Sequence, residues 1–120
     1  DTTAPTVSSL ATNGAVSLSG DPTGILVTAA MEITFNEALD ESMVIGDPGK
    51  ANAFLITQTE TGIPVPVAAT VTYVAATFKV VITPTSSLGA STAYSIMLTS
   101  GIKNGSGLRF AGAKYGFTTA

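Results

Sequence analysis

The residues best equipped for chemistry are acidic, and most of them gather in one stretch of the chain. Five of the eight acidic residues lie between positions 32 and 47, namely Glu32, Glu37, Asp40, Glu41 and Asp47. Paired carboxylates could serve glycoside hydrolysis, which requires two of them at a fixed separation on either side of a cleft. Acidic residues that are neighbours in one loop provide neither the separation nor the cleft. We therefore predict that the chain is not an enzyme.

Calcium binding is the second chemistry that this stretch could support, because calcium takes oxygen ligands from carboxylates and carbonyls in loops. The candidate ligands are Asp40, Glu41 and Asp47, with Asp1 or Asn104 as further contributors. Their spacing does not match an EF-hand loop. The favoured interpretation is a solvated helical turn, whose N-terminal dipole stabilises nearby negative charge. We expect no cofactor, and calcium stays the open alternative.

Composition excludes several other classes of site. The chain has no cysteine and no histidine, so it lacks thiolate ligands, disulfides and the commonest general base. Five scattered cations and a net charge of −3 form no basic stripe for nucleic acid. No apolar run approaches the roughly 18–20 residues of a membrane helix, so we expect no direct membrane insertion. Only 11% of residues are charged, and hydroxyl side chains take their place, which is typical of secreted bacterial β-proteins.

Alternating apolar residues predict a protein built of short strands. In residues 30–36, Met31, Ile33 and Phe35 should face a core while the polar residues between them face solvent. The same reasoning directs other apolar side chains inward: Phe54, Ile56, Val71, Tyr73, Phe78, Val80, Ile82 and Phe117. About seven strands are predicted, at 6–11, 30–36, 54–58, 69–73, 78–83, 94–98 and 114–119. Residues 63–66 should be extended but not central, because two prolines withhold hydrogen-bond donors.

The stretch from Leu88 to Leu98 predicts how the strands are arranged. Tyr94, Ile96 and Leu98 alternate on one face, and Leu88 lies six positions before Tyr94 across a small-residue loop. This spacing suits a corner where the chain crosses between the sheets of an immunoglobulin-like sandwich, with the tyrosine hydroxyl bonded back to the loop backbone. The alternative is an ordinary amphipathic strand with a core tyrosine.

One helical interruption is expected between strands. Residues 37–44 contain helix formers, and Leu39 and Met43 share one face at i, i+4 spacing. We therefore predict an all-β sandwich with one short helical turn in a crossover loop. The whole chain, residues 1–120, should be a single domain, with residues 1–5 as an inter-domain linker.

An ordered set of motifs resembles a known family. These are Asp1–Val7, the run from Ile33 to Asp40, residues 54–57, residues 80–84, the stretch from Leu88 to Leu98, residues 101–104 and residues 117–119. In order and spacing the set resembles the bacterial immunoglobulin-like domain of S-layer proteins and large repetitive surface proteins. The resemblance implies a Greek-key sandwich with its termini at opposite ends, and no catalytic residue.

The chain departs from this family pattern at two places. Where the family often has an aspartate after the sixth strand, this chain has Asn104, so a charged ligand or capping aspartate is absent. The segment from Asn13 to Gly24 is longer than usual, and an extra loop there could carry specific binding.

The resemblance implies a non-catalytic spacer, stalk or assembly unit of a secreted or cell-surface bacterial protein, with several domains in tandem. Its expected partners are neighbouring domains of the same polypeptide, with a surface protein or a carbohydrate as further possibilities. The alternatives are a ligand-binding adhesion domain, which exposed tyrosines would support, and an accessory domain of an exported polysaccharide-degrading enzyme.

Overall fold

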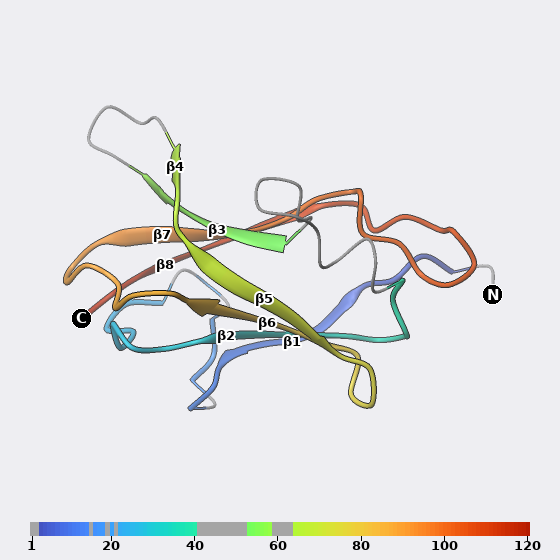
Figure 1. The fold of residues 1–120 in the computed structure, drawn as a ribbon, viewed down its shortest axis with the longest axis horizontal. Coiled ribbons are helices and arrows are strands. Elements are labelled where there is room, and N and C mark those ends of the chain that lie inside the picture. The colour runs from blue at the N-terminus through green and yellow to red at the C-terminus, as the bar shows by residue number, and fades with distance from the viewer. Residues whose placement is uncertain (1–2, 15, 19, 21, 41–52, 59–63) are drawn as a thin grey trace.

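The fold is an all-β sandwich of two four-stranded antiparallel sheets (Figure 1). The computed structural model describes residues 3–14, 16–18, 20, 22–40, 53–58 and 64–120. Within these residues eight strands form: β1 (Val7–Thr12), β2 (Met31–Phe35), β3 (Ala53–Gln58), β4 (Pro64–Pro66), β5 (Ala69–Val74), β6 (Lys79–Pro84), β7 (Ala93–Leu98) and β8 (Ala113–Thr118). Apart from β4, they run roughly along the long axis, and the first described residues and the C-terminus lie at opposite ends (Figure 1).

The strand order is that of an immunoglobulin-like Greek key. One sheet has the order β1-β2-β6-β5 and the other β4-β3-β7-β8, so the chain changes sheet after β2, β4 and β6. The central pairs, β2 with β6 and β3 with β7, join strands that are distant in sequence. The predicted fold class is confirmed. The extra strand is the proline-bounded β4, which lies at a sheet edge. Proline has no backbone N–H, so this segment cannot supply all the hydrogen bonds that a central strand donates to its two neighbours.

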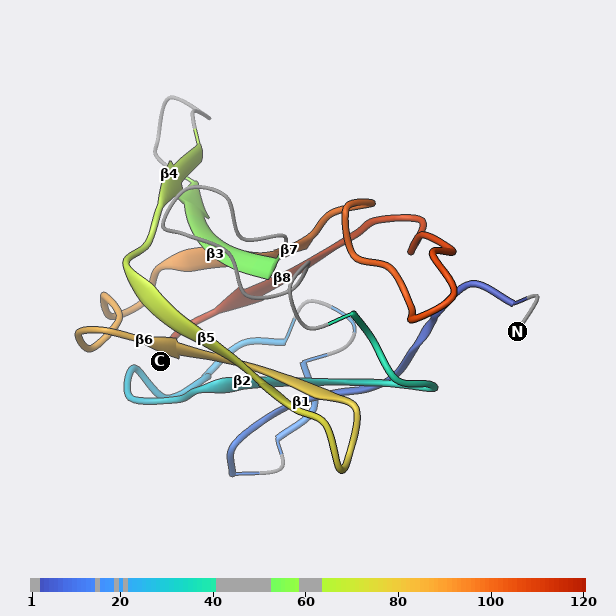
Figure 2. The same cartoon turned by 45° about the vertical axis from the view of Figure 1, so that its right-hand side comes forward.

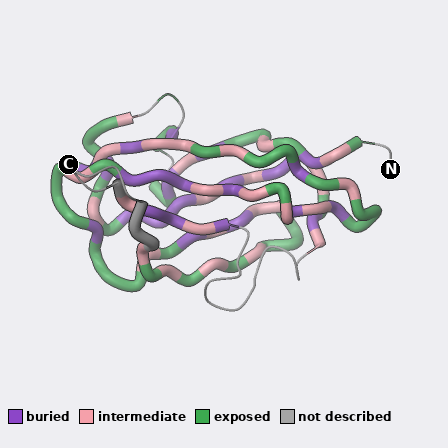
Figure 3. The backbone as a smooth tube through the Cα atoms, turned by 90° about the horizontal axis from the view of Figure 1, so that it is seen from above, coloured by how far each residue is buried: buried purple, intermediate pink, exposed green. Residues whose placement is uncertain are grey.

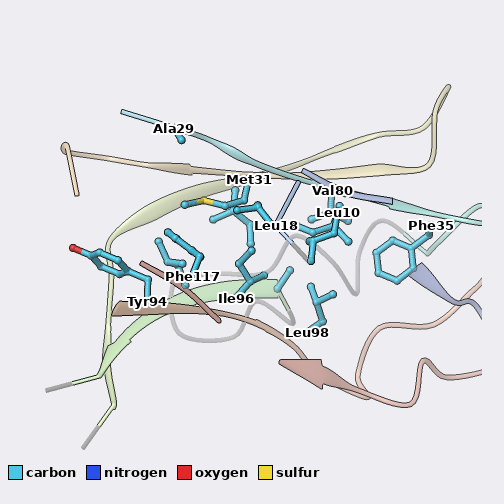
Figure 4. Close-up of a cluster of buried hydrophobic side chains, with 14 of the residues drawn as sticks. Leu10, Leu18, Ala29, Met31, Phe35, Val80, Tyr94, Ile96, Leu98 and Phe117 are labelled. Atoms are coloured by element: carbon cyan, nitrogen blue, oxygen red, sulfur yellow. The ribbon is translucent and has the colours of Figure 1, made fainter. Parts of the chain in front are cut away.

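Buried apolar side chains from both sheets form one continuous core. Buried positions concentrate along the strands and exposed positions along the loops (Figure 3). The side chains of Ile33, Val80, Ile82 and Ile96 are 0% exposed. Other sequence-predicted residues join the same cluster between the sheets: Met31, Phe35, Leu88, Tyr94, Leu98 and Phe117. Figure 4 shows all of these except Leu88 with labels.

The sequence-based prediction for Phe54 is wrong. Leu55 is the β3 residue that is 0% exposed, and it pairs with the core residue Ile96. Phe54 pairs instead with Met97 and is half-buried on the outer face of the sheet. Ile56 is buried but lies opposite Ser95, on that same outer face. Residues 53–56 are all apolar, so no polar residue marks which phase of the alternation faces the core.

The predicted helical turn does not form in the part of residues 37–44 that the structure describes. Residues 36 and 37 form a bend, and Leu39 makes an isolated bridge with Asn104. The N–H of Leu39 donates to the Tyr73 hydroxyl at 2.9 Å, and the N–H of Asp40 donates to the Lys103 carbonyl at 2.8 Å. Local helix propensity is overridden because these N–H groups bond across the end of the sandwich. Residues 41–44, including Met43, lie outside the described residues.

Residues from the loops between strands also close the core. Leu18 and Ile25, from the long connection between β1 and β2, are 1% and 2% exposed. Ile25 also pairs in parallel with Thr119, next to the end of β8. Ile102 and Phe110, from the β7–β8 loop, are 0% and 6% exposed, and the Phe110 ring meets that of Phe35 edge-on at 5.3 Å. The elaborated loop at 13–24 therefore contributes to packing in its described part.

Tyr94 joins the loop before β7 to the core. Its hydroxyl accepts a hydrogen bond from the Gly89 N–H at 2.7 Å, five residues back along the chain. The ring is buried and stacks on Phe117 at a centroid distance of 5.7 Å, while Leu88 packs into the same cluster. This geometry is that of a tyrosine corner, in which one side chain fixes the path of the chain between two sheets.

Replacing Tyr94 with Phe should lower the free energy of unfolding by about 1 kcal/mol, because the Gly89 N–H loses its partner. The denaturant midpoint measures this change. Tyr115→Phe is the matched control, since Tyr115 is half-buried against the core and its hydroxyl makes no hydrogen bond among the described residues. Equal midpoints for the two variants would contradict a stabilising role for the corner bond.

Candidate functional site

The acidic residues do not converge on a metal site in the described part of the chain. No group of three or more acidic, histidine or cysteine side chains placed to hold a metal ion occurs there. Glu32 forms an ion pair with Lys79 at 3.0 Å, and Glu37 accepts a hydrogen bond from Asn104. Of the calcium candidates, Asp40 is half-buried, while Glu41 and Asp47 lie outside the described residues.

Asn104 organises the end of the sandwich where the chain starts. It is 2% exposed, although it belongs to an Asn-Gly sequence that favours a flexible turn. Its side-chain oxygen accepts from the N–H groups of Ser106 and Leu108, each at 3.0 Å. Its amide nitrogen donates to Glu37 Oε1 at 2.9 Å and to the Thr3 carbonyl at 3.2 Å. Both ends of the amide are therefore occupied, and the turn is held rather than free.

An asparagine at this position makes two kinds of contact, only one of which an aspartate could make. The amide oxygen caps the two loop N–H groups, as a carboxylate would. The amide N–H₂ group then donates to the Glu37 carboxylate and to a carbonyl, which a carboxylate cannot do. Asn104 thereby connects the chain start, the β2–β3 loop and the β7–β8 loop.

The first described residues are attached to the body of the domain. The Thr6 N–H donates to Asn36 Oδ1 at 2.9 Å, and the Asn36 N–H donates to the Thr6 carbonyl at 3.0 Å. Pro5 is buried, and Thr3 is held by Asn104. Residues 3–5 of the expected linker thus lie against the sandwich.

The C-terminal residues are also held by hydrogen bonds to loops, at the other end of the sandwich. The Ala120 N–H donates to the Ile25 carbonyl and its carbonyl accepts from the Ser91 N–H, both at 2.9 Å. Thr119 is 3% exposed, and its hydroxyl donates to the Gly89 carbonyl and accepts from the Thr92 N–H. The last residue therefore leaves the sandwich from a defined position between two loops.

The tyrosines offer no exposed stacking surface. Tyr94 is buried, and Tyr73 and Tyr115 are half-buried against the core. An open hollow of about 370 Å³ lies over β7 and β8, lined by Ala93, Tyr94, Ser95, Lys114, Gly116, Phe117 and Thr118. A carbohydrate site would require exposed rings with which sugar faces can stack. This hollow presents mainly small side chains and one lysine.

Asn104 and Thr119 organise the two ends of the sandwich, and local sequence patterns do not predict this role. Both are buried polar residues, and all buried side-chain polar atoms in the described part of the chain have hydrogen-bond partners. Their partners are far away in sequence: Glu37 lies 67 residues from Asn104, and Gly89 lies 30 residues from Thr119.

Replacing Asn104 with Asp should destabilise the domain by about 2 kcal/mol at neutral pH, because a second carboxylate then faces Glu37 in a buried setting. One carboxyl of that pair must take up a proton to relieve the repulsion. The difference from the parent chain should therefore shrink as the pH falls below about 5. Chemical denaturation at pH 7.5 and pH 4.5 measures it.

The matched control for this prediction is Asn13→Asp. Asn13 also precedes a glycine, but it is exposed, and its Oδ1 accepts from the Ala30 N–H at 3.3 Å, a bond that a carboxylate can keep. A pH-independent loss in Asn104→Asp, or an equal loss in both variants, would contradict the pairing of Asn104 with Glu37.

Comparison with solved structures finds the same fold in two kinds of protein. The crystal structure of the S-layer protein rSbsC(31-844) matches with a TM-score of 0.61 and 20% identity, over 97% of this chain and 14% of that chain. Domains 1–6 of the surface layer protein SbsC match with a TM-score of 0.62 and 20% identity, over 98% and 14% of the two chains. The chain thus spans only a small part of these S-layer proteins.

The second kind is PcoC, a methionine-rich copper resistance protein from Escherichia coli. It matches with a TM-score of 0.68 and 20% identity, over 98% of this chain and 100% of PcoC. At this identity the likeness shows the fold alone. Of the three methionines here, Met31 is 0% exposed, Met97 is half-buried and Met43 lies outside the described residues. No curated protein sequence matches the chain.

The family comparison is the most extensive in coverage. The model of the bacterial Ig-like domain matches residues 1–119. The strand order, the tyrosine corner and the fold of the S-layer neighbours agree with that match. In the described residues no helix has the length and apolarity of a membrane span. By the extent of the sequence match and by its sandwich, the chain belongs to the bacterial Ig-like domain family.

Proposed function

We propose that this domain is a non-catalytic structural module, a spacer or assembly unit, of a secreted or cell-surface bacterial protein. Family membership and the S-layer neighbours both support a structural surface module and point away from an enzyme. The observation that carries the proposal is the position of the chain ends, which lie at opposite ends of an elongated body of 42 × 27 × 22 Å (Figure 1). Modules with this geometry, joined in tandem, extend a polypeptide.

The attachment of both chain ends supports a mechanical role. Thr3 and Thr6 are bonded to loops at one end, and Thr119 and Ala120 are bonded to loops at the other. Because the strands run along the long axis, tension between the ends loads many ladder hydrogen bonds in parallel. A spacer benefits from this arrangement, since force is shared before any single strand separates.

The surface chemistry fits a neutral scaffold better than a recognition site. With 11% charged residues and a net charge of −3, the chain has no strong field to steer a charged ligand. No tyrosine in the described residues is exposed, so the alternative of carbohydrate binding has no ring platform to support it. The partners that we propose are the neighbouring domains of the same polypeptide.

The proposed tandem arrangement predicts a length for the full-length polypeptide. In the full-length polypeptide, each copy of the module should add about its own longest extent of 42 Å to the maximum dimension seen by small-angle X-ray scattering or electron microscopy. Deletion of one internal module is the control and should shorten the particle by the same amount. A compact particle whose maximum dimension does not depend on the number of modules would overturn the spacer role.

Surface location can be tested because the module contains no cysteine. In the full-length protein expressed in its native cells, Thr72→Cys on the exposed face of β5 should react with a membrane-impermeant maleimide before lysis. The control Ile96→Cys, at a position that is 0% exposed, should react only after denaturation. Labelling of Thr72→Cys only after lysis would contradict a surface location.

A further inference from the structure

The end of the sandwich that the chain leaves, here called the exit pole, has a distinct composition. It is formed by residues 22–30, 83–92 and 119–120, whose loops lie together with the C-terminus (Figure 1 and Figure 2). These residues include no charged side chain. Asp21, which precedes the first of these loops, lies outside the described residues. The opposite end carries Glu37, Asp40, Lys103 and Arg109 in its loops.

Leu26 projects from the exit pole into solvent. It is 67% exposed, more than the other two exposed large apolar residues of the described chain, Val16 at 52% and Val74 at 41%. Its backbone is nevertheless held in place. The Leu26 carbonyl accepts from the Ala29 N–H at 3.0 Å, and the adjacent Ile25 is 2% exposed and bonded to Thr118 and Ala120. A fixed backbone thus presents an apolar side chain that the domain itself does not cover.

A shallow hollow lies in the same pole. It has a volume of about 160 Å³ and is lined by residues 27–29 and 83–87. A cavity of about 150 Å³ accommodates a molecule the size of benzene. The hollow is therefore large enough to receive one side chain of a partner. Its lining is of threonine, serine, alanine, valine and proline, so it favours an uncharged side chain.

We propose that the exit pole is an interface for the domain that follows in the same polypeptide, with Leu26 as its apolar anchor. This inference rests on the proposed function, because it requires the module to stand before another. The occupant follows from the chain path: Ala120 leaves between residues 25 and 91, so whatever comes next is tethered beside Leu26. A short tether gives the next domain an effective concentration on the order of millimolar, so that even a weak contact with the exit pole can be populated.

The chemistry of the pole agrees with that occupant. Depletion of charge distinguishes the buried centre of protein interfaces from the remaining surface, whereas overall apolarity does not. Contact between the exit pole of one domain and the start of the next is heterologous, meaning that two different surfaces meet. Repeated along a polypeptide, such a contact builds an open rod. The contact would set the angle between consecutive domains.

The test uses the full-length polypeptide with Leu26→Ser, and Val16→Ser as the matched control. Val16 is also an exposed apolar residue, but it lies on the turn after β1, outside the exit pole. Limited proteolysis of the junction after Ala120 reports how often the two domains separate. We expect the junction in Leu26→Ser to be cut roughly fivefold faster than in the parent, because the apolar contact between Leu26 and the next domain is lost. The junction in Val16→Ser should be cut at the parent rate.

Hydrogen exchange supplies a second readout that does not depend on the protease. Amides of residues 22–30 and 83–92 should exchange faster in Leu26→Ser than in the parent, and should be unchanged in Val16→Ser. If a domain follows but both variants match the parent, this inference is overturned while the spacer function stands. If no domain follows the module, the proposed tandem function fails and this inference with it.

Self-association is a separate outcome of the same experiment. A concentration-dependent dimer of the full-length protein that Leu26→Ser abolishes would assign the exit pole to a second copy of the molecule. Light scattering over a range of concentrations measures this, and such a dimer would overturn the assignment to the following domain.

Discussion

The structure depends on one layer of apolar side chains that is shared by the two sheets. Ile33, Val80 and Ile82 enter it from one sheet, and Leu55 and Ile96 from the other, all fully buried. Each buried aliphatic side chain contributes about 1.5–3 kcal/mol, and the strands alternate so that every second residue can contribute. The chain has no cysteine, so no disulfide joins the sheets and the apolar core must hold them together. The register of the two central strand pairs is therefore critical, because a shift of one residue would turn these side chains to the outer faces.

The ends of this layer would admit water if loops did not cover them. Leu18 and Ile25 close one part of the core and Ile102 and Phe110 another, all from connections rather than strands. Apolar loop residues bring buried backbone with them, and buried N–H and C=O groups require partners. The hydrogen bonds of Asn104 and the cross-loop bonds near Thr119 satisfy this requirement at the two ends. Core closure and fixed chain ends are thus consequences of the same packing problem.

The sequence predicted best where polar residues mark the faces of a strand. Glu32 and Thr34 separate the inward residues of β2, and its orientation follows directly. In β3 the run Ala53-Phe54-Leu55-Ile56 has no such marker, so only pairing with β7 sets its phase. The predicted helical turn does not form in its described part for a related reason. The N–H groups of Leu39 and Asp40 bond to Tyr73 and Lys103, which are distant in sequence, instead of to a helix of their own. The two Asn-Gly pairs are alike in local sequence, yet Asn104 is buried and Asn13 is exposed. The difference comes from the contacts of Asn104 with Glu37 and Thr3, which are distant in sequence.

A domain whose first and last residues are bonded to its own loops restricts where a tandem polypeptide can bend. The sandwich itself resists bending, because its strands run parallel to the long axis and share one core. Flexibility is then confined to the few residues between the last bonded residue of one domain and the first bonded residue of the next. Contact at the exit pole through Leu26 would restrict this hinge further. Salt does not screen such an apolar contact, whereas it does screen contacts between charged residues. Under the proposed tandem arrangement, the stiffness of the polypeptide would therefore depend little on ionic strength.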